Sequence, residues 1–178
     1  MGGAGELADE VACAAPAYLG ASSRDPRVIE ALARVDRADF LPPAERAGAY
    51  VDAPLPIGGG QTCSQPSMVA FMLDLLLLEP GLRVLEVGSG SGWAAALAAE
   101  LVKPGGSVCA CEILPSLAAA LTERFASRAD IEVAEGDGSL GLPDRPPWDR
   151  VFLSAGVKRG FDPEPLVGRL APGGILLY

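Results

Sequence analysis

Short apolar segments alternate with segments of helical periodicity from Arg83 to the last residue, Tyr178. Helices are expected between them, over Gly92–Val102, Pro115–Ser127 and Glu164–Leu170. The segments that read as strands are Arg83–Val87, Val108–Glu112, Ile131–Ala134, Arg150–Ala155 and Ile175–Tyr178. Strands that alternate with helices pack as a parallel sheet between layers of helices. The sequence therefore predicts an α/β fold with a doubly wound, mostly parallel sheet.

The first 60 residues have a different pattern. A helix is expected over "DPRVIEALARV", with Asp25 as its N-cap and Pro26 in its first turn. Four prolines and four glycines between Phe40 and Gly60 predict irregular chain. A further helix should begin near Pro66 and direct these residues inward: Met68, Val69, Met72, Leu75 and Leu76. We expect residues 1–60 to form a helical and irregular preface that packs on the same structural domain as the α/β region of residues 61–178.

Composition limits the partners. The 178 residues include 49% hydrophobic residues, enough for one buried core, and the formal net charge is −9 with no basic run. This charge argues against binding to nucleic acid or to anionic lipid. The longest apolar run, Val69–Leu78, is too short to span a bilayer, and the N-terminus is acidic. We therefore expect a soluble, cytoplasmic protein that binds neither nucleic acid nor membrane.

The chain has no histidine. This excludes Ser-His-Asp and Cys-His catalysis, so any chemistry must proceed without imidazole as a base. Its four cysteines lack the paired spacing of a zinc site, and no metal site is expected. We expect the cysteines to be reduced thiols.

A glycine-rich loop follows the first predicted strand, in "VLEVGSGSGW". Ligands of such sheets bind at the carboxyl ends of the strands, and the N-terminus of the following helix offers free N–H groups. Gly88, Gly90 and Gly92 would let a ligand approach the backbone closely. The alternative is that they only form a tight turn with close helix–strand packing. A dinucleotide fingerprint fits poorly because Trp93 stands where glycine or alanine is required, so a nicotinamide oxidoreductase is a remote alternative.

The order Glu-x-Gly-x-Gly-x-Gly, beginning at Glu86, resembles the first motif of S-adenosylmethionine-dependent methyltransferases. The resemblance implies a Rossmann-like methyltransferase sheet in which Glu86, Ser89 and the loop glycines bind the cofactor. Glu112 ends the next strand, where a carboxylate can accept hydrogen bonds from both ribose hydroxyls. Asp137 and Gly138 follow the third strand and are candidates to meet the adenine. A solvated strand end for Glu112 and a plain turn at Asp137 remain alternatives.

The upstream segment "PLPIGGGQTCSQPSMVAFMLDLL", Pro54–Leu76, closely resembles the signature of protein-L-isoaspartate O-methyltransferases. Further segments that resemble this family are "VIEALARVDRADFLPP", "RVLEVGSGSGW", "EGDGSLGLP" and "PWDRVFLSAG". The resemblance runs from Asp25 to the C-terminus. It implies methyl transfer from S-adenosyl-L-methionine to the free α-carboxylate of isoaspartyl residues in damaged peptides and proteins. Isoaspartyl peptides or proteins are thus the expected partners.

By resemblance Ser64 is the active-site serine, with Thr62 and Gln65 as its catalytic neighbours. We expect Ser64 to donate a hydrogen bond to the acceptor carboxylate, which is ionised at neutral pH and needs no general base. The alternative is that Ser64 only caps the helix beginning at Pro66. Ser154, ending the fourth strand, stands where threonine is commoner in the family.

The resemblance also leaves departures and alternatives. Gly59 and Cys63 replace a polar and an aliphatic residue of the family pattern, and the family's final antiparallel strand pair is expected to be missing after Ile175–Tyr178. That strand would then be an edge, and we expect a monomer unless this edge drives association. A methyltransferase acting on another acceptor, such as a small molecule or RNA, and a non-catalytic binding module that has lost activity by truncation are the alternatives.

Overall fold

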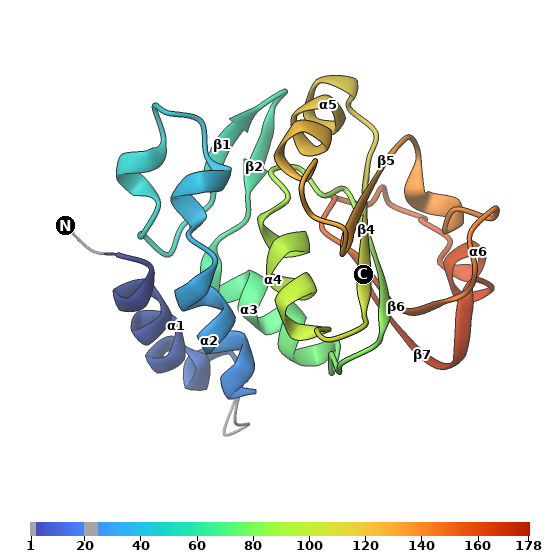
Figure 1. Ribbon diagram of the computed structural model, residues 1–178, viewed down its shortest axis with the longest axis horizontal. Helices are drawn as coiled ribbons and strands as arrows, with labels where there is room; N and C mark the ends of the chain where they lie inside the picture. The colour runs from blue at the N-terminus through green and yellow to red at the C-terminus, as the bar shows by residue number, and fades with distance from the viewer. Residues whose placement is uncertain (1–2, 20–24) are drawn as a thin grey trace.

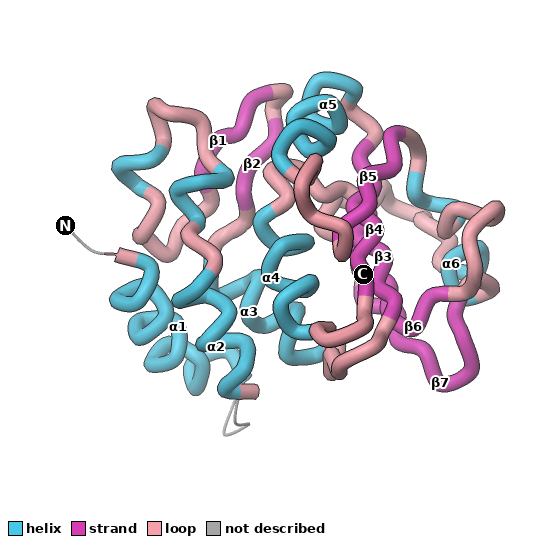
Figure 2. The backbone as a smooth tube through the Cα atoms, viewed as in Figure 1, coloured by secondary structure: helices cyan, strands magenta, loops and turns pink. Residues whose placement is uncertain are grey.

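A five-stranded parallel sheet forms the centre of the protein, in the order β5-β4-β3-β6-β7 (Figures 1 and 2). The computed structural model describes residues 3–19 and 25–178. The strands are β3 (Arg83–Val87), β4 (Ser107–Glu112), β5 (Ile131–Glu135), β6 (Trp148–Leu153) and β7 (Leu170–Leu177). The chain adds β4 and β5 on one side of β3, then β6 and β7 on the other, so the strand order reverses at β3. The predicted parallel α/β sheet is confirmed.

The two faces of the sheet carry separate hydrophobic clusters because successive side chains of a strand point to opposite faces. Val84 of β3 belongs to a large cluster beneath α3 (Pro66–Leu75), α4 (Trp93–Leu101) and α5 (Pro115–Arg124). Leu85 belongs to a smaller cluster closed by Leu166 of α6 (Glu164–Val167). In Figure 1, α4 and α6 accordingly lie on opposite sides of the sheet.

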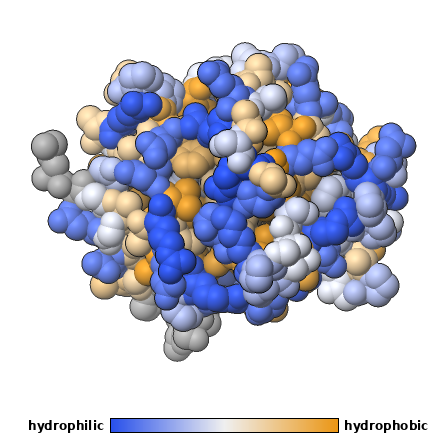
Figure 3. All heavy atoms as spheres, viewed as in Figure 1, coloured by the Kyte–Doolittle hydropathy of each residue, from blue (hydrophilic) through white to orange (hydrophobic). Residues whose placement is uncertain are grey.

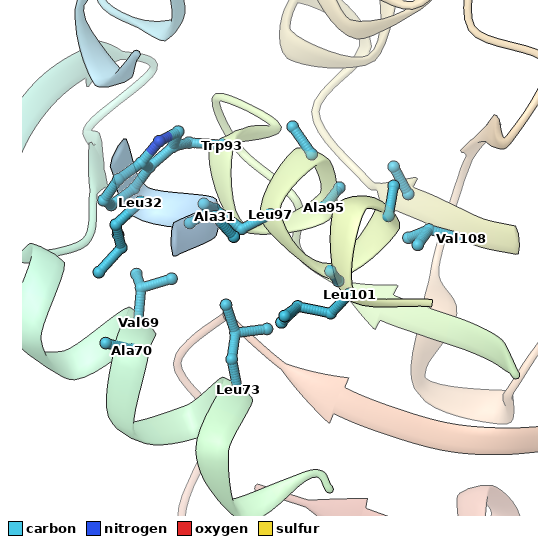
Figure 4. Packing of buried hydrophobic residues seen from close by; sticks show 14 of the residues in the cluster. Ala31, Leu32, Val69, Ala70, Leu73, Trp93, Ala95, Leu97, Leu101 and Val108 are labelled. Carbon is cyan, nitrogen blue, oxygen red and sulfur yellow. The ribbon is translucent and has the colours of Figure 1, made fainter. Parts of the chain in front are cut away.

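Helix α4 lies between the sheet and the N-terminal helices. Its residues Trp93, Leu97 and Leu101 face Leu32 and Leu73 across the larger core (Figure 4). A helix covered on most of its surface needs little polar face, which explains why α4 is apolar except for Glu100. Glu100 is half-buried near the end of the helix and pairs with Lys103 and Arg128.

The N-terminal region contains α1 (Ala4–Leu19) and α2 (Pro26–Arg34). The predicted cap of α2 is confirmed, since the Asp25 carboxylate accepts a hydrogen bond from the Arg27 N–H at 2.9 Å. Helix α1 was not predicted individually, and it buries Leu7 and Val11 in the larger core. None of the helices within the described ranges is both long and apolar enough to cross a membrane.

The prediction of irregular chain up to Gly60 is wrong in part. The short 3-10 helices η1 (Arg37–Phe40) and η2 (Arg46–Gly48) lead into a hairpin of β1 (Leu55–Gly58) and β2 (Gln61–Cys63). Pro56 is compatible with this hairpin because a two-stranded ribbon has free edges. The hairpin stands apart from the central sheet.

The inward face predicted for α3 is also partly wrong. Of the predicted residues, Val69 and Leu76 are buried and Met72 is half-buried against the core. Met68 and Leu75 are exposed instead. Those two residues are seven apart and share one side of the helix, which faces away from the core.

Several predicted boundaries move as well. Strand β6 runs over Trp148–Leu153 rather than Arg150–Ala155, so Ser154 follows the strand instead of ending it. Helix α5 ends at Arg124 rather than Ser127, α6 ends at Val167 rather than Leu170, and β7 begins at Leu170, five residues before the predicted start. The early start of β7 is achieved by an irregularity in its pairing with β6 between Trp148 and Arg150.

Candidate active site

A pocket opens at the carboxyl ends of β3 and β6, where the strand order reverses. Side chains from α3, α4 and β6 form its apolar walls. Its polar side chains come from three distant segments: Thr62, Ser64, Glu86, Ser89, Ser91 and Ser154. The backbone of Gly88 and Gly90 lines it too. The fold thus brings the predicted active-site serine and the glycine loop to one place.

The loop glycines are required by the protein itself. Gly88 has a φ of 82°, and a Cβ there would lie 2.4 Å from the Cβ of Ala155. Gly92, the N-cap of α4, has a φ of 81°, and its Cβ would lie 2.6 Å from Leu121 Cδ2. L-residues rarely adopt such backbone angles, so both positions need glycine for turn geometry and packing before any ligand is considered.

Glu86 is fully buried on β3 beside the pocket. Its Oε1 accepts a hydrogen bond from Ser154 Oγ at 2.6 Å, while its Oε2 has no hydrogen-bond partner among the described residues. Burial raises the pKa of Glu86 to about 7, although the bond from Ser154 opposes the rise. The nearby Ser89 Oγ is also buried without a partner in the described chain. Two buried polar atoms of pocket-lining residues, Glu86 Oε2 and Ser89 Oγ, therefore have no hydrogen-bond partner in the described chain.

Glu112, at the end of β4, holds the glycine loop. Its Oε2 accepts from the Gly90 N–H at 2.8 Å, and its Oε1 accepts from the Leu114 N–H at 2.9 Å. The side chain is 4% exposed, so it is not the solvated strand end considered as an alternative. It lies behind the pocket lining, joined to it through Gly90.

Asp137 and Gly138 have local roles in the structure. Asp137 is exposed and caps η3 (Gly138–Leu140) by accepting from the Ser139 N–H at 2.9 Å, a bond that lowers the pKa of Asp137. Gly138 is buried against Val87 and leaves no room for a Cβ, which would lie 2.9 Å from Val87 Cγ1. Both lie outside the pocket, and their contact with adenine stays a prediction.

Ser64 does not cap α3. The N-cap position is Gln65, and the helix N-terminus is satisfied from a distance, because Asp52 Oδ1 accepts from the Ser67 N–H at 2.8 Å. The capping explanation of Ser64 is therefore wrong, and Ser64 lines the pocket. The Gln65 amide turns to the helix instead and donates to Ser67 Oγ at 2.8 Å.

The two cysteines of β4 lie outside the pocket. The free thiols of Cys109 and Cys111 are buried on the side of β4 that faces the smaller core, and burial raises their pKa values to about 12 and about 11. They stay protonated at neutral pH and are not reactive thiolates.

Arg37, which sequence reasoning did not select, is buried beside the pocket. Within the described residues, no group of three His, Cys, Asp or Glu side chains is placed to hold a metal.

A parallel sheet with its pocket at the reversal point, a glycine loop after the first strand, and acids on β3 and β4 define the Rossmann-like methyltransferase class. Comparison with known proteins is more specific. The profile of the protein-L-isoaspartate(D-aspartate) O-methyltransferase family matches residues 19–178, and the chain belongs to that family.

Individual relatives agree. A protein-L-isoaspartate O-methyltransferase from Aeropyrum pernix is 51% identical over 151 residues, which cover 83% of this chain and 57% of the relative. One from Anaeromyxobacter dehalogenans strain 2CP-C is 50% identical, covering 85% of this chain and 71% of the relative. The chain thus spans little more than half of the first and under three quarters of the second.

Solved structures support the fold. A protein-L-isoaspartate O-methyltransferase of 27% sequence identity superposes with a TM-score of 0.78, covering 95% of this chain and 54% of that one. A Plasmodium falciparum structure described as a complex with S-adenosyl-L-homocysteine is 22% identical, with a TM-score of 0.80 over 100% of this chain and 85% of that one.

Proposed function

We propose that this protein transfers the methyl group of S-adenosyl-L-methionine to the free α-carboxylate of L-isoaspartyl residues in damaged peptides and proteins, as a repair reaction. The observation that carries the proposal is the shared pocket of Ser64 and the glycine loop. The family signature around Ser64 and the cofactor motif are separated in sequence, and the fold joins them across the end of β3.

The chemistry of the pocket suits the cofactor. S-adenosyl-L-methionine supplies an activated methyl group on a sulfonium and carries an ammonium that needs acceptors. Glu86 Oε2 and Ser89 Oγ are buried acceptors without partners in the described chain, and buried polar atoms normally have one. We propose that these two hold the amino-acid end, with Gly88, Gly90 and Gly92 shaping the loop. Glu112, Asp137 and Gly138 would hold the adenosine.

The acceptor needs position rather than a base. An α-carboxyl group has a pKa of about 3.5 and is ionised at neutral pH. We propose that Ser64 donates a hydrogen bond to this carboxylate and orients one oxygen toward the methyl group, with Thr62 beside it in the pocket. Such a reaction suits a chain without histidine. Gln65 holds the Thr62–Gln65 segment against the start of α3 through its hydrogen bond to Ser67.

The proposal includes the setting. The partners are isoaspartyl peptides and proteins, not nucleic acid or membrane, since the net charge is −9. We propose a monomer in the cytoplasm, where the free thiols would stay reduced. Association, if measured, is expected through β7, which lies at one end of the sheet order.

The test is methyl transfer from radiolabelled S-adenosyl-L-methionine to two peptides that differ only in having isoaspartate or normal aspartate at one position. The label is measured as radioactive methanol, which base releases from the methyl ester. We expect label on the isoaspartyl peptide alone. Label on both peptides, or on neither while the cofactor still binds, would overturn the proposed acceptor.

A further inference from the structure

Arg37 is the one fully buried arginine in the described residues, with 1% of its surface exposed. Its guanidinium donates to backbone carbonyls of two separate segments. Nη1 reaches the carbonyls of Ala49 and Val51, at 3.2 and 3.1 Å. Nη2 reaches those of Ala53, Cys63 and Ser64, at 2.8, 3.1 and 3.0 Å.

No carboxylate pairs with this guanidinium among the described ion pairs. Burying a charge without a counterion is costly unless hydrogen bonds replace its water. Here carbonyl dipoles do so for the two Nη atoms, together with the ring of Trp93, whose centroid lies 5.3 Å from the guanidinium carbon. The Nε–H is buried without a partner in the described chain. Such an arrangement tolerates little displacement, because each carbonyl that moves away leaves a buried donor unsatisfied.

The groups that Arg37 joins all border the active-site pocket or lead to it. Ser64 and Cys63 line the pocket from one side, and Trp93, the first residue of α4, lines it from the glycine-loop side. Two of the remaining carbonyls, those of Val51 and Ala53, flank Asp52. The Asp52 carboxylate accepts from the Ser67 N–H in the first turn of α3. Arg37 therefore contacts the Ser64 backbone itself, the segment around Asp52 and the tryptophan that begins α4.

We propose that Arg37 is a positioning residue for Ser64: its guanidinium clamps the 49–53 and 63–64 backbone against Trp93 and fixes the Ser64 hydroxyl relative to the glycine loop. The inference rests on the proposed function for its catalytic consequence, but the clamp itself is a property of the fold.

The first experiment is a double-mutant cycle on methyl transfer to the isoaspartyl peptide, with R37K, S64A and the pair. A lysine keeps the charge but its compact ammonium cannot serve both carbonyl groups. We expect R37K to lower kcat about tenfold with Ser64 present and less than about twofold in the S64A background. Equal losses in the two backgrounds would overturn a role through Ser64.

A matched control is R83K. Arg83 also stacks on a tryptophan, with its guanidinium carbon 5.0 Å from the Trp148 ring, and also donates to backbone carbonyls, those of Pro146 and Pro147. It lies at the opposite end of β3 from the pocket. R83K should therefore leave kcat unchanged; a loss equal to that of R37K would overturn the specific role of Arg37.

The second experiment does not depend on activity. Hydrogen exchange measured by mass spectrometry should be about tenfold faster over residues 61–65 in R37K and unchanged in R83K. Unchanged exchange in R37K would overturn the clamp. An inactive wild type would overturn the proposed function alone, since exchange still decides the clamp.

If R37K does not fold, hydrogen exchange of the wild-type protein alone tests whether Arg37 holds the two segments together. A clamp makes residues 49–53 and 61–65 open together, so their amides should share one opening free energy across a denaturant series. Two different opening free energies would overturn the proposal.

Discussion

Glu86 and Glu112 are neighbouring acids in unlike surroundings. Glu112 uses both oxygens to accept from backbone N–H groups of Gly90 in the glycine loop and of Leu114 at the start of α5. Glu86 is deeper, has one bond from Ser154 and keeps one oxygen free within the described structure. Glu112 therefore fixes the position of the glycine loop, whereas burial disfavours the charged form of Glu86 and raises its pKa.

The first prediction at this scale concerns pH. The pKa of Glu86 rises from 4.5 to about 7 on folding, so the native state keeps a proton that the unfolded chain releases. Stability from this group is complete below pH 4.5 and is lost as pH rises to about 7. At about 1.4 kcal/mol per pKa unit, the loss is up to about 3 kcal/mol.

Urea unfolding of the wild type and E86Q at pH 5 and 7.5 measures this loss. The wild type should lose more stability than E86Q between the two values, since glutamine keeps an acceptor for Ser154 and does not ionise. Parallel changes in the two proteins would show that Glu86 does not carry the effect.

A second prediction separates the two sides of the pocket. S64A should lower kcat about tenfold or more, the loss expected for a hydrogen bond to a charged group, with cofactor affinity kept. E112A should weaken cofactor binding more than it lowers kcat. Calorimetry with S-adenosyl-L-homocysteine and steady-state kinetics give both quantities. Equal losses of both in each folded variant would argue against the assigned roles.

At the scale of elements, the turn from β3 into α4 packs closely against α5 at Gly92. Gly92 and Gly105 both have positive φ angles, 81° and 84°, but only Gly92 has neighbours close to where a Cβ would be. G105A measures backbone strain alone, about 1 to 2 kcal/mol. G92A adds the clash with Leu121 and Phe125 and should cost several kcal/mol in urea unfolding. Equal losses of unfolding free energy in G92A and G105A would mean that Leu121 and Phe125 move aside at little cost.

The central sheet could be predicted from local patterns. Each strand lies in a short segment rich in apolar residues, and apolar residues recur with helical periodicity in the segments between them. The β1–β2 hairpin could not, since its prolines and glycines predict a loop as readily as a turn. The roles around Ser64 were hidden for another reason. Whether a serine caps a helix depends on Asp52, 12 residues earlier, and Arg37 sits among charged residues and looks solvent-exposed in sequence. Contacts between distant segments leave no local pattern.

At the scale of the whole molecule, charge is the dominant feature. Hydrophilic residues occupy much of the face in Figure 3, and the net charge is −9. An anionic peptide approaches against this field, whereas a cationic one is attracted. Under the proposed function, short-range donors in the pocket supply the binding energy for the acceptor carboxylate.

Salt should therefore act oppositely on two substrates. Raising ionic strength from about 0.01 to about 0.1 M shortens the Debye length from about 30 to about 10 Å. KM should fall for an isoaspartyl peptide flanked by glutamates and rise for one flanked by lysines. Initial rates over a salt series measure both. If KM changed in the same direction with salt for both peptides, the net charge of the protein would not govern substrate binding.

The order of strands in the sheet also has a consequence for synthesis. β3 lies between β4 and β6, and Glu86 meets Ser154 across 68 residues of chain. While the ribosome is still translating the segment before Trp148, β3 has one finished neighbour and one open edge, and the carboxyl group of Glu86 has no hydroxyl of Ser154 beside it. An open edge of this kind can pair with the wrong strand. The nascent chain is thus most exposed to misassembly in the interval before β6 emerges. Chains stalled in that interval should be cut by protease far more readily than chains stalled once Ser154 has left the ribosome.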